Sequence, residues 1–568
     1  MQALSPTLQA PNIPARASVS GADIFARARH DLFNKSPVRD PKILEAAQTL
    51  QQGLAVEAER IVGKILAKRP RDPHALNIMA EIAKSRRDFR TAEACLARCV
   101  QIAPDHPAYR YNHACILLEL GRIDAGLAEV DILEAKYPDN ILFLNLKAAF
   151  LNKRRRYAES VACYRQLAAR CPDSTDVMMG LALTLRSLGG QTEESISILR
   201  KITEFDPGCG AAWQSLASVK TVRFGEADIR SMEAQLAKPA IGAAERTDLY
   251  YALGKAYDDA RQYEKAFQSY SRGNAIRRID MDYDPDVTTG MVARMRVVYT
   301  PELFREREGA GCPSAEPIFV LGMQRSGSTL TEQILGAHSQ IEPAGELQSM
   351  IRIVAEDVMP KSGADYPNGV DQLAPEDLKA FGEKYLKSVR PLLHENKPHF
   401  VDKNCYNLWQ VGLIHLIFPN ARIIDIRRHP ISCCWANFSV AFSQAAPPLS
   451  YKLTDIGRFY HDYARVMAHF DRVLPGKVHR VIYERLVADL EGETRRMLDF
   501  LDLPFEQSCL EYYKHERSFN SISNEQVRRP IFKEGVERWL SYEPWLGPLK
   551  AALGPVLDAY PGVPDFPD

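Results

Sequence analysis

The sequence predicts two architectures in one chain: an α-solenoid of helical repeats, followed by an α/β domain with a mostly parallel sheet. In the first half, proline and alanine recur about every 34 residues. In the second half, short apolar runs alternate with helical stretches, and the first of these runs leads into a loop that contains two glycines. The length of 568 residues is enough for two or more domains.

The composition is that of a soluble globular protein, with 46% hydrophobic and 25% charged residues. Lys+Arg and Asp+Glu both number 72, so no global field favours nucleic acid or an anionic membrane. No run of about 18 apolar residues predicts a membrane span. Residues 1–30 lack the apolar core of a secretory signal, so a cytoplasmic location is expected. The 11 cysteines have no metal-ligand spacing, and we expect reduced, mostly buried thiols.

Two ladders of residues define the repeats of the first half. The proline ladder has spacings of 34, 34, 34 and 35 residues, and consists of Pro70, Pro104, Pro138, Pro172 and Pro207. The alanine ladder runs in step and consists of Ala80, Ala114, Ala148, Ala182 and Ala217. Small residues at a fixed phase let paired helices approach closely. This period resembles the tetratricopeptide repeat. A further unit is expected over residues 249–267, after a degenerate stretch from about Val222 to Arg246.

The repeats are expected to stack into a curved solenoid over residues 36–285, because a single helix pair cannot bury its apolar face alone. A disordered tail over residues 1–35 would precede the solenoid, and a linker over residues 286–312 would follow it. The concave face is one candidate surface for a protein or peptide partner. A spacer or a homodimerisation element is the alternative, and the sequence does not decide between them.

Four apolar runs predict strands of the second half: Ile318–Leu321, His399–Val401, Ile423–Ile426 and Val478–Tyr483. The loop after the first run, Gly322 to Thr329, follows the phosphate-loop pattern G-x-x-x-x-G-K-[ST], except that Ser328 replaces the lysine. Backbone N–H groups at such a strand-to-helix turn point at a phosphate. Because the cation of this loop is Arg325 instead, we expect a phosphate donor other than ATP.

The loop Gln324-Arg325-Ser326-Gly327-Ser328-Thr329 resembles the 5′-phosphosulfate loop of sulfotransferases that use 3′-phosphoadenosine 5′-phosphosulfate (PAPS) and release PAP. The resemblance implies a sulfotransferase fold for residues 313–568, and extends from about Pro317 to Leu549. It is closest to tyrosylprotein sulfotransferases and to bacterial proteins that join tetratricopeptide repeats to such a domain. It implies that Arg325 holds the 5′-phosphate and sulfuryl oxygens, with Ser326, Gly327, Ser328 and Thr329 completing the loop.

A second block, Ala421 to Pro430, is similar to the 3′-phosphate site of the family, with Arg428 on the arginine position. The serine expected eight residues later is Ala436, so Arg428 would act alone or with Ser432 or Ser439. Tyr483 and Glu484 match a packing segment of the family to which no chemistry is assigned. Residues 521–530, which include Arg529, and then Arg538 and Trp539 look like the segment of the family that closes over the nucleotide.

The resemblance also implies the reacting groups. Glu346 matches the position of the catalytic base in the tyrosylprotein enzymes, and Glu342 is a weaker competitor before a Pro-Ala-Gly turn. Lys403 and Ser523 match groups that stabilise the leaving oxygen, together with Arg325. We expect structural or surface roles for His338 and His429, and no metal.

The first hypothesis is therefore an enzyme that transfers a sulfuryl group from PAPS to a hydroxyl, with protein or peptide tyrosine as the first choice of acceptor. A carbohydrate or small-molecule acceptor is the alternative within this class. Two other classes remain: a P-loop kinase, and a non-catalytic repeat scaffold with a degenerate nucleotide domain. The missing lysine argues against the kinase, whereas Ala436 is the main support for the scaffold.

Overall fold

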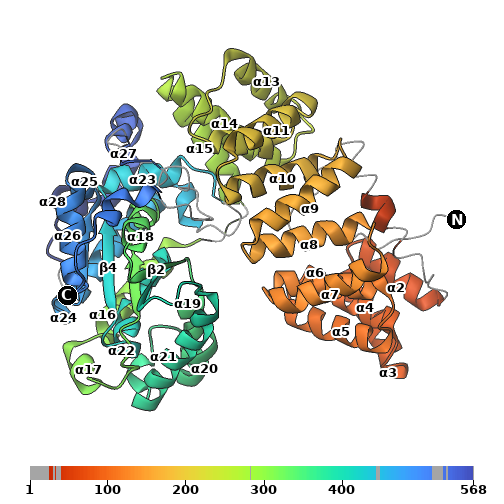
Figure 1. The fold of residues 1–568 in the computed structure, drawn as a ribbon, viewed down its shortest axis with the longest axis horizontal. Coiled ribbons are helices and arrows are strands. Elements are labelled where there is room, and N and C mark those ends of the chain that lie inside the picture. Colours follow the sequence, from red (N-terminus) through yellow and green to blue (C-terminus); the bar gives the residue numbers. More distant parts are fainter. Residues whose placement is uncertain are drawn as a thin grey trace. The chain divides into compact units, whose positions relative to one another are not determined.

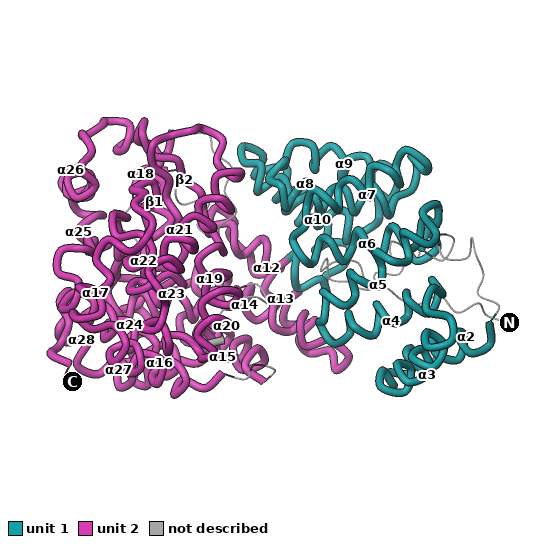
Figure 2. The backbone as a smooth tube through the Cα atoms, turned by 90° about the horizontal axis from the view of Figure 1, so that it is seen from below, with its two compact units in different colours: residues 1–212 teal, residues 213–568 magenta. Residues whose placement is uncertain are grey.

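A computed structural model describes residues 25–29, 32, 40–279, 281, 283–442, 448–514, 529–531 and 535–566. Its backbone forms two compact units, residues 1–212 and residues 213–568, which Figure 2 shows in teal and magenta. Throughout its described part the first unit is helical, and the second unit combines further helices with a five-stranded sheet. Every candidate site residue that the structure describes lies in the second unit.

The first unit consists of paired helices, as the repeat period predicts (Figure 1). Its helices are α2 (Pro41–Gln51), α3 (Ala55–Lys68), α4 (Pro73–Ser85), α5 (Phe89–Ile102), α6 (Pro107–Glu119), α7 (Ile123–Lys136), α8 (Ile141–Lys153), α9 (Tyr157–Arg170), α10 (Thr175–Leu188) and α11 (Thr192–Phe205). The first four members of the alanine ladder are buried, at no more than 1% exposure. This confirms that small residues line the contacts between helices.

Local sequence explains where these helices begin. Two residues after a ladder proline, a polar side chain caps the next helix: Asp72 accepts from the N–H of His74, and Asn140 accepts from the N–H of Leu142. Of the tail expected over residues 1–35, residues 25–29 and 32 are described. Leu32 is buried in the repeat core, so packing against the repeats begins before residue 36.

The repeat pattern becomes irregular at the start of the second unit. Helices α12 (Gly210–Ser218) and α13 (Glu226–Leu236) have 9 and 11 residues, and Ala217 is half-buried, unlike the rest of its ladder. The pattern returns in α14 (Ala243–Asp259) and α15 (Tyr263–Ile279), where a Cβ on Gly254 would lie 2.5 Å from Tyr270. The side chain of Asn274 in α15 donates to the carbonyl of Phe438 at 2.9 Å, so this last pair packs on the α/β part of the same unit.

Residues 286–312, assigned above to a linker, are largely helical and packed. They contain most of α16 (Pro285–Val298) and all of α17 (Pro301–Glu306), and α16 lies against the long helix α24 (Leu453–Val473). Thr289 donates to Asp462 at 2.7 Å, and Nε2 of His469 lies 2.8 Å from the carbonyl oxygen of Tyr299. The domain boundaries at residues 285 and 313 follow the sequence pattern and stay a prediction about independent folding.

The sheet is parallel throughout, in the order β2-β3-β1-β4-β5. Its strands are β1 (Pro317–Leu321), β2 (Ile341–Gly345), β3 (His399–Lys403), β4 (Arg422–Arg427) and β5 (Val478–Ile482). The four predicted strands are confirmed. The prediction of a turn at Pro-Ala-Gly was wrong, because Pro343 and Gly345 lie within the edge strand β2. An edge strand tolerates a residue that cannot donate to a neighbour, and the register shifts at this point.

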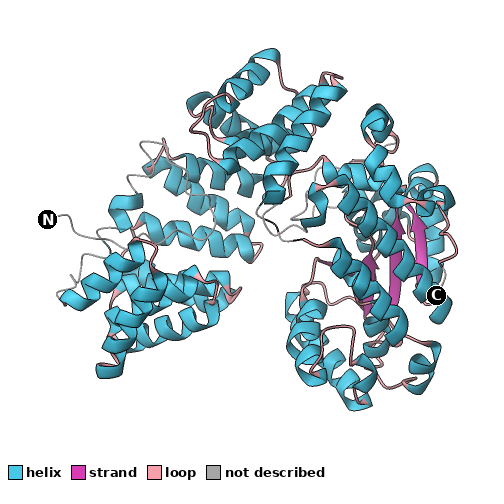
Figure 3. Ribbon diagram, turned by 180° about the vertical axis from the view of Figure 1, so that it is seen from behind, coloured by secondary structure: helices cyan, strands magenta, loops and turns pink. Residues whose placement is uncertain are grey.

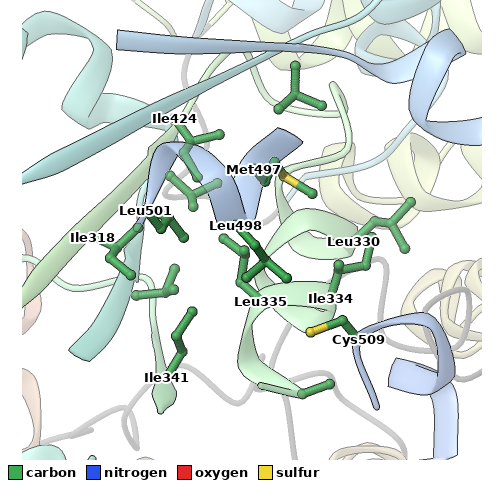
Figure 4. Packing of buried hydrophobic residues seen from close by; sticks show 14 of the residues in the cluster. Ile318, Leu330, Ile334, Leu335, Ile341, Ile424, Met497, Leu498, Leu501 and Cys509 are labelled. Atoms are coloured by element: carbon green, nitrogen blue, oxygen red, sulfur yellow. The ribbon is translucent and has the colours of Figure 1, made fainter. Parts of the chain in front are cut away.

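Helices flank the sheet on both sides (Figure 3). The helices from β1 onward are α18 (Ser328–Gly336), α19 (Ser349–Ile353), α20 (Met359–Ser362), α21 (Pro375–Val389), α22 (Val411–Ile417), α23 (Pro430–Phe438), α24, α25 (Tyr483–Ala488), α26 (Leu490–Phe500), α27 (Gly547–Leu553) and α28 (Pro555–Ala559). On one face, Ile318 and Ile424 pack against Leu335 of α18 and Leu498 of α26 (Figure 4). This core sets where α18 begins relative to β1, and hence the shape of the loop between them.

None of the described helices is both long and apolar enough to cross a bilayer.

Candidate active site

The site lies at the carboxyl edge of the sheet, where a parallel α/β fold binds ligands. Glu346 follows β2, the phosphate loop follows β1, Lys403 ends β3, and Arg428 follows β4. The register places Val320 of β1 opposite Lys403. Because β1 is the central strand, with β3 and β4 on either side, the topology brings these segments to one edge although they are distant in sequence.

Two glycines shape the phosphate loop. Gly322 has φ +135°, and a Cβ there would lie 2.3 Å from the carbonyl oxygen of Ile426. Gly327 has φ +113°, and a Cβ there would lie 2.5 Å from the ring of Tyr483. The loop therefore passes too close to β4 and to the start of α25 for any side chain at these positions.

Gly327→Ala is therefore expected to lower the free energy of unfolding by at least about 2 kcal/mol, through strain and close contact together. Gly476→Ala is the matched control, because Gly476 also has a positive φ, +74°, but nothing lies within 4 Å of its Cβ position. Urea unfolding measures both variants. Equal losses in the two would show that the contact with Tyr483 is unimportant.

Arg325 and Ser326 occupy the middle of the loop. Arg325 has φ +67°, and its carbonyl accepts from Nη1 of Arg428 at 3.2 Å. Burial, and then the charge of Arg428, lower the pKa of Arg325 to about 10. The buried Oγ of Ser326 has no hydrogen-bond partner within the described part of the chain. Two cations and a buried hydroxyl at a helix N-terminus are suited to an anion.

Ser328 and Thr329 form the first turn of α18 and are both buried. The hydroxyl of Ser328 lies 3.6 Å from the sulfur of Cys405, which follows β3. On the other side of the loop, the carbonyl of Gln324 accepts from Asn437 at 2.7 Å and from Cys433 at 3.2 Å. Helix α23 therefore fixes the loop through two residues one turn apart.

The arginine pair at the end of β4 divides into a buried and a site-facing member. Arg427 is 1% exposed and packs over Tyr463 of α24. Arg428 lies over the ring of Tyr483, with its guanidinium carbon 5.0 Å from the ring centroid. Its Nη2 donates to the carbonyl of Gly535 at 2.6 Å.

The candidates for a further 3′-phosphate donor lie along α23. Ser432 is buried in its first turn and donates to the carbonyl of Val536 at 3.0 Å, so its proton is already engaged. Ala436 is half-buried in the same helix, and Ser439 ends it. Ser432 therefore has no free proton with which to replace the hydroxyl that is missing at Ala436.

Glu346 and Lys403 form an ion pair across β2 and β3. The side chain of Lys403 is only 4% exposed, whereas that of Glu346 is 57% exposed and open to an acceptor. Burial by itself lowers the pKa of Lys403, but the carboxylates of Glu332 and Glu346 outweigh it and raise the net pKa. Lys403 therefore stays protonated at neutral pH.

Glu332 is a residue of the site that no motif of the sequence indicates. This glutamate of α18 is 4% exposed, and its Oε1 accepts from the N–H of Gly345 at 2.9 Å. It thus holds the end of β2, just before Glu346, and lies beside Lys403. The sequence shows only a glutamate one turn into an apolar helix, and its partner on β2 could not be inferred from that position.

Glu342 is excluded as a competing base. Its Oε1 accepts from the N–H of His394 at 2.6 Å and its Oε2 from the N–H of Glu395 at 2.9 Å, so both oxygens anchor the loop before β3.

The two loop histidines have structural partners, as expected. His338 is fully buried, with Nε2 2.9 Å from the carbonyl oxygen of Pro504. His429 stacks on Trp539 at 5.2 Å between ring centroids, and its backbone N–H donates to Glu484 at 3.0 Å. Glu484 therefore supports the start of α23, in keeping with a packing role.

Of the two remaining predicted site residues, the structure describes one. Ser523 lies outside the described residues. Arg529 is described and exposed, and its carbonyl accepts from the hydroxyl of Tyr512 at 3.2 Å.

The acidic residue on β4 is already paired with protein side chains. Asp425, the acidic residue on β4, is fully buried and accepts from Arg480 at 3.0 Å and from Tyr463 at 2.5 Å. Among the described residues, no group of three or more His, Cys, Asp or Glu side chains is close enough to hold a metal ion.

Comparison with known proteins gives the class of this domain. Residues 317–507 match the sulfotransferase family, and residues 247–278, which span α14 and α15, match the tetratricopeptide repeat. The chain therefore carries a sulfotransferase-family domain joined to tetratricopeptide repeats.

Individual relatives show how far the similarity extends. An uncharacterized protein from Aquifex aeolicus (strain VF5) is 32% identical over 450 residues, which cover 78% of this chain but only 58% of that protein. Protein-tyrosine sulfotransferase 1 of Danio rerio is 25% identical over 258 residues, covering 42% of this chain and 71% of the relative. A solved sulfotransferase domain from the Synechococcus PCC 7002 olefin synthase is 21% identical, covers 41% of this chain and 90% of that domain, and has a TM-score of 0.31.

Proposed function

We propose that this protein transfers a sulfuryl group from PAPS to a hydroxyl acceptor. The observation that carries the proposal is the meeting of Arg325, Arg428, Lys403 and Glu346 at one edge of a sulfotransferase-family sheet. This set combines cations for an anionic donor with one accessible carboxylate for the acceptor. The other classes, kinase and scaffold, explain this combination less well.

The residues of the loop fit the donor. Arg325, the hydroxyl of Ser326 and the N–H groups that begin α18 would hold its 5′-phosphate, with Ser328 and Thr329 beside them. Arg428 would hold the 3′-phosphate, with Arg529 from the later segment and with Ser432, whose hydroxyl would then donate to the phosphate instead of the carbonyl of Val536. When bound, the donor supplies the sulfuryl group that passes to the acceptor.

Glu346 is the proposed base. Its carboxylate is accessible and is held by Lys403, so it can take the proton of an acceptor hydroxyl that approaches the edge of β2. Lys403, which stays protonated, stabilises the negative charge that develops on the leaving oxygen, together with Arg325 and the proposed Ser523. No step assigned to these residues requires a metal ion.

Protein or peptide tyrosine is the proposed acceptor, and its support is the similarity to relatives named protein-tyrosine sulfotransferases, at 22–25% identity. A carbohydrate or small-molecule hydroxyl is the alternative. We further propose that the concave face of the repeats receives the protein or peptide partner, since tetratricopeptide repeats commonly bind polypeptides. Homodimerisation through the repeats is the second option for that surface.

Binding of PAP and of ATP with magnesium, measured separately by calorimetry, tests the donor. We expect PAP to bind and ATP to bind much more weakly, because the loop lacks the lysine that reaches the outer phosphates of ATP. Selective binding of ATP would reject the sulfotransferase proposal in favour of a kinase. Binding of PAP without transfer from labelled PAPS to any tyrosine, carbohydrate or phenol tested would favour the scaffold.

A further inference from the structure

The second unit contains a chain of contacts that leads from the proposed donor site to the last helical repeats. Arg428 and Ser432 donate to the carbonyls of Gly535 and Val536, at 2.6 Å and 3.0 Å. Three residues after Gly535, Arg538 forms an ion pair with Asp258 at the end of α14. Asp258 also accepts from the hydroxyl of Tyr542 at 2.6 Å. Residues 535–542 therefore join the arginine of the donor site to a repeat helix.

The contacts continue from α14 to the turn after α12. Asp259, next to Asp258, pairs with Lys255 and with Arg223 at 3.4 Å. Nη1 of Arg223 in turn donates to the carbonyl of Lys220 at 2.8 Å. The backbone of Lys220 thus joins the same set of contacts as Arg538, although Lys220 comes from the repeats.

Lys220 is accessible to solvent, yet enough protein surrounds it to desolvate its ammonium. This desolvation, and then the charges of Arg325, Arg538, Arg428 and Lys255, lower the pKa of Lys220 to about 8. The strongest charges acting on Lys220 are thus all positive, and two of them are the proposed donor-binding arginines. Cations that gather in this way repel one another and favour a bound anion.

We propose that Lys220 binds a phosphate of the donor nucleotide, so that the helical repeats contribute a cation to the donor site. This inference rests on the proposed function and deepens it. It also provides a substitute for the hydroxyl that is missing at Ala436. The α/β domain lacks the hydroxyl expected on α23, and a lysine from the repeats supplies a stronger, charged donor near the same arginine. The last repeats are then part of the donor site and not merely a surface for partners.

Calorimetric titration of the full chain with PAP and with AMP, which lacks the 3′-phosphate, tests the inference. We expect Lys220→Gln to weaken PAP binding about tenfold, because a charge-assisted hydrogen bond is lost. The control is Lys238→Gln, since Lys238 lies just after α13 and bonds to Gln235 at 2.7 Å. Lys220→Arg should retain PAP binding. A larger loss for PAP than for AMP assigns Lys220 to the 3′-phosphate, and equal losses assign it to the 5′-phosphate.

The pH dependence gives a second, independent readout. As pH rises from 7 to 9, Lys220 loses its proton in the free protein, so PAP affinity should fall. The pKa of Lys255 is also lowered, by burial, and the pKa of Arg325 is lowered to about 10, so the titration of both groups contributes as well. The Lys220→Arg variant separates the contributions of Lys220 and Lys255, because it should lose only the part of the pH dependence that is due to Lys220.

The outcomes separate this inference from the proposed function. Failure of the unmodified protein to bind PAP would reject the donor itself. Normal PAP binding by the unmodified protein and equally by Lys220→Gln would reject the role of Lys220 alone. If Lys220→Gln binds PAP normally but raises KM for the acceptor, the lysine serves the acceptor and the inference is wrong. Thermal unfolding of each variant verifies that the fold is intact.

Discussion

Glu346→Gln is expected to reduce sulfuryl transfer about 10²- to 10⁴-fold, because the amide cannot accept the proton of the acceptor hydroxyl. PAP affinity should change little, since Glu346 lies after β2 and the phosphate loop lies after β1. Glutamine still accepts a hydrogen bond from Lys403, so the substitution removes the base with little change of shape. Steady-state transfer from PAPS and calorimetric binding of PAP measure the two effects.

Glu491→Gln is the matched control for this substitution, because Glu491 is an exposed carboxylate on α26 that pairs with Arg495 at 2.7 Å. Its transfer rate should equal that of the unmodified protein. A Glu346→Gln variant with nearly full activity would show that another group takes the proton. Lys403 is not that group, because its raised pKa keeps it protonated.

Arg428→Ala is expected to weaken PAP binding about 10- to 100-fold, through loss of a charge-assisted contact with the 3′-phosphate. The effect on AMP should be smaller, because AMP lacks that phosphate. Arg428 also bonds to the carbonyl of Arg325, so part of the loss acts through the loop and appears with both nucleotides. The ratio of the PAP and AMP effects measured by calorimetry isolates the direct contact.

Arg422→Ala provides the control on the same strand. Arg422 begins β4 at the opposite edge of the sheet and pairs with Asp502, so its removal should leave both affinities unchanged. If Arg428→Ala weakens AMP as much as PAP, the 3′-phosphate is not the partner of Arg428. The anchoring of the loop would then account for the whole effect.

The repeats and most of the sheet were predictable because their signals are local and periodic. Buried alanines recur at the repeat spacing, and β1, β3, β4 and β5 are short apolar runs. The strand β2 was missed because Pro343 and Gly345 usually mark a turn. Only its position at the edge of the sheet, where one side needs no partner, makes a strand possible there.

The candidate site was predictable in part. Arg325, Arg428, Lys403 and Glu346 each follow or end a strand-like segment or a recognisable loop. Their resemblance to a known family was enough to propose a role for each. Glu332 and Asn437 could not be predicted, because each looks like an ordinary polar residue of a helix. Their importance comes from a hydrogen bond to a backbone group of another element. The position of Ser523 stays a prediction.

The sequence by itself determined the two architectures, the phosphate-loop pattern with its two glycines, and the kind of charges that follow the strands. These features depend on residues close together in the chain, through helix period, backbone conformation and strand length. The tertiary structure alone decided which charges meet. It paired Glu346 with Lys403, buried Arg427 while leaving Arg428 beside the loop, and joined the turn that carries Lys220 to the contacts that lead from Arg428 through residues 535–542. Such meetings depend on the order of strands and the packing of distant helices, which no local pattern of residues encodes.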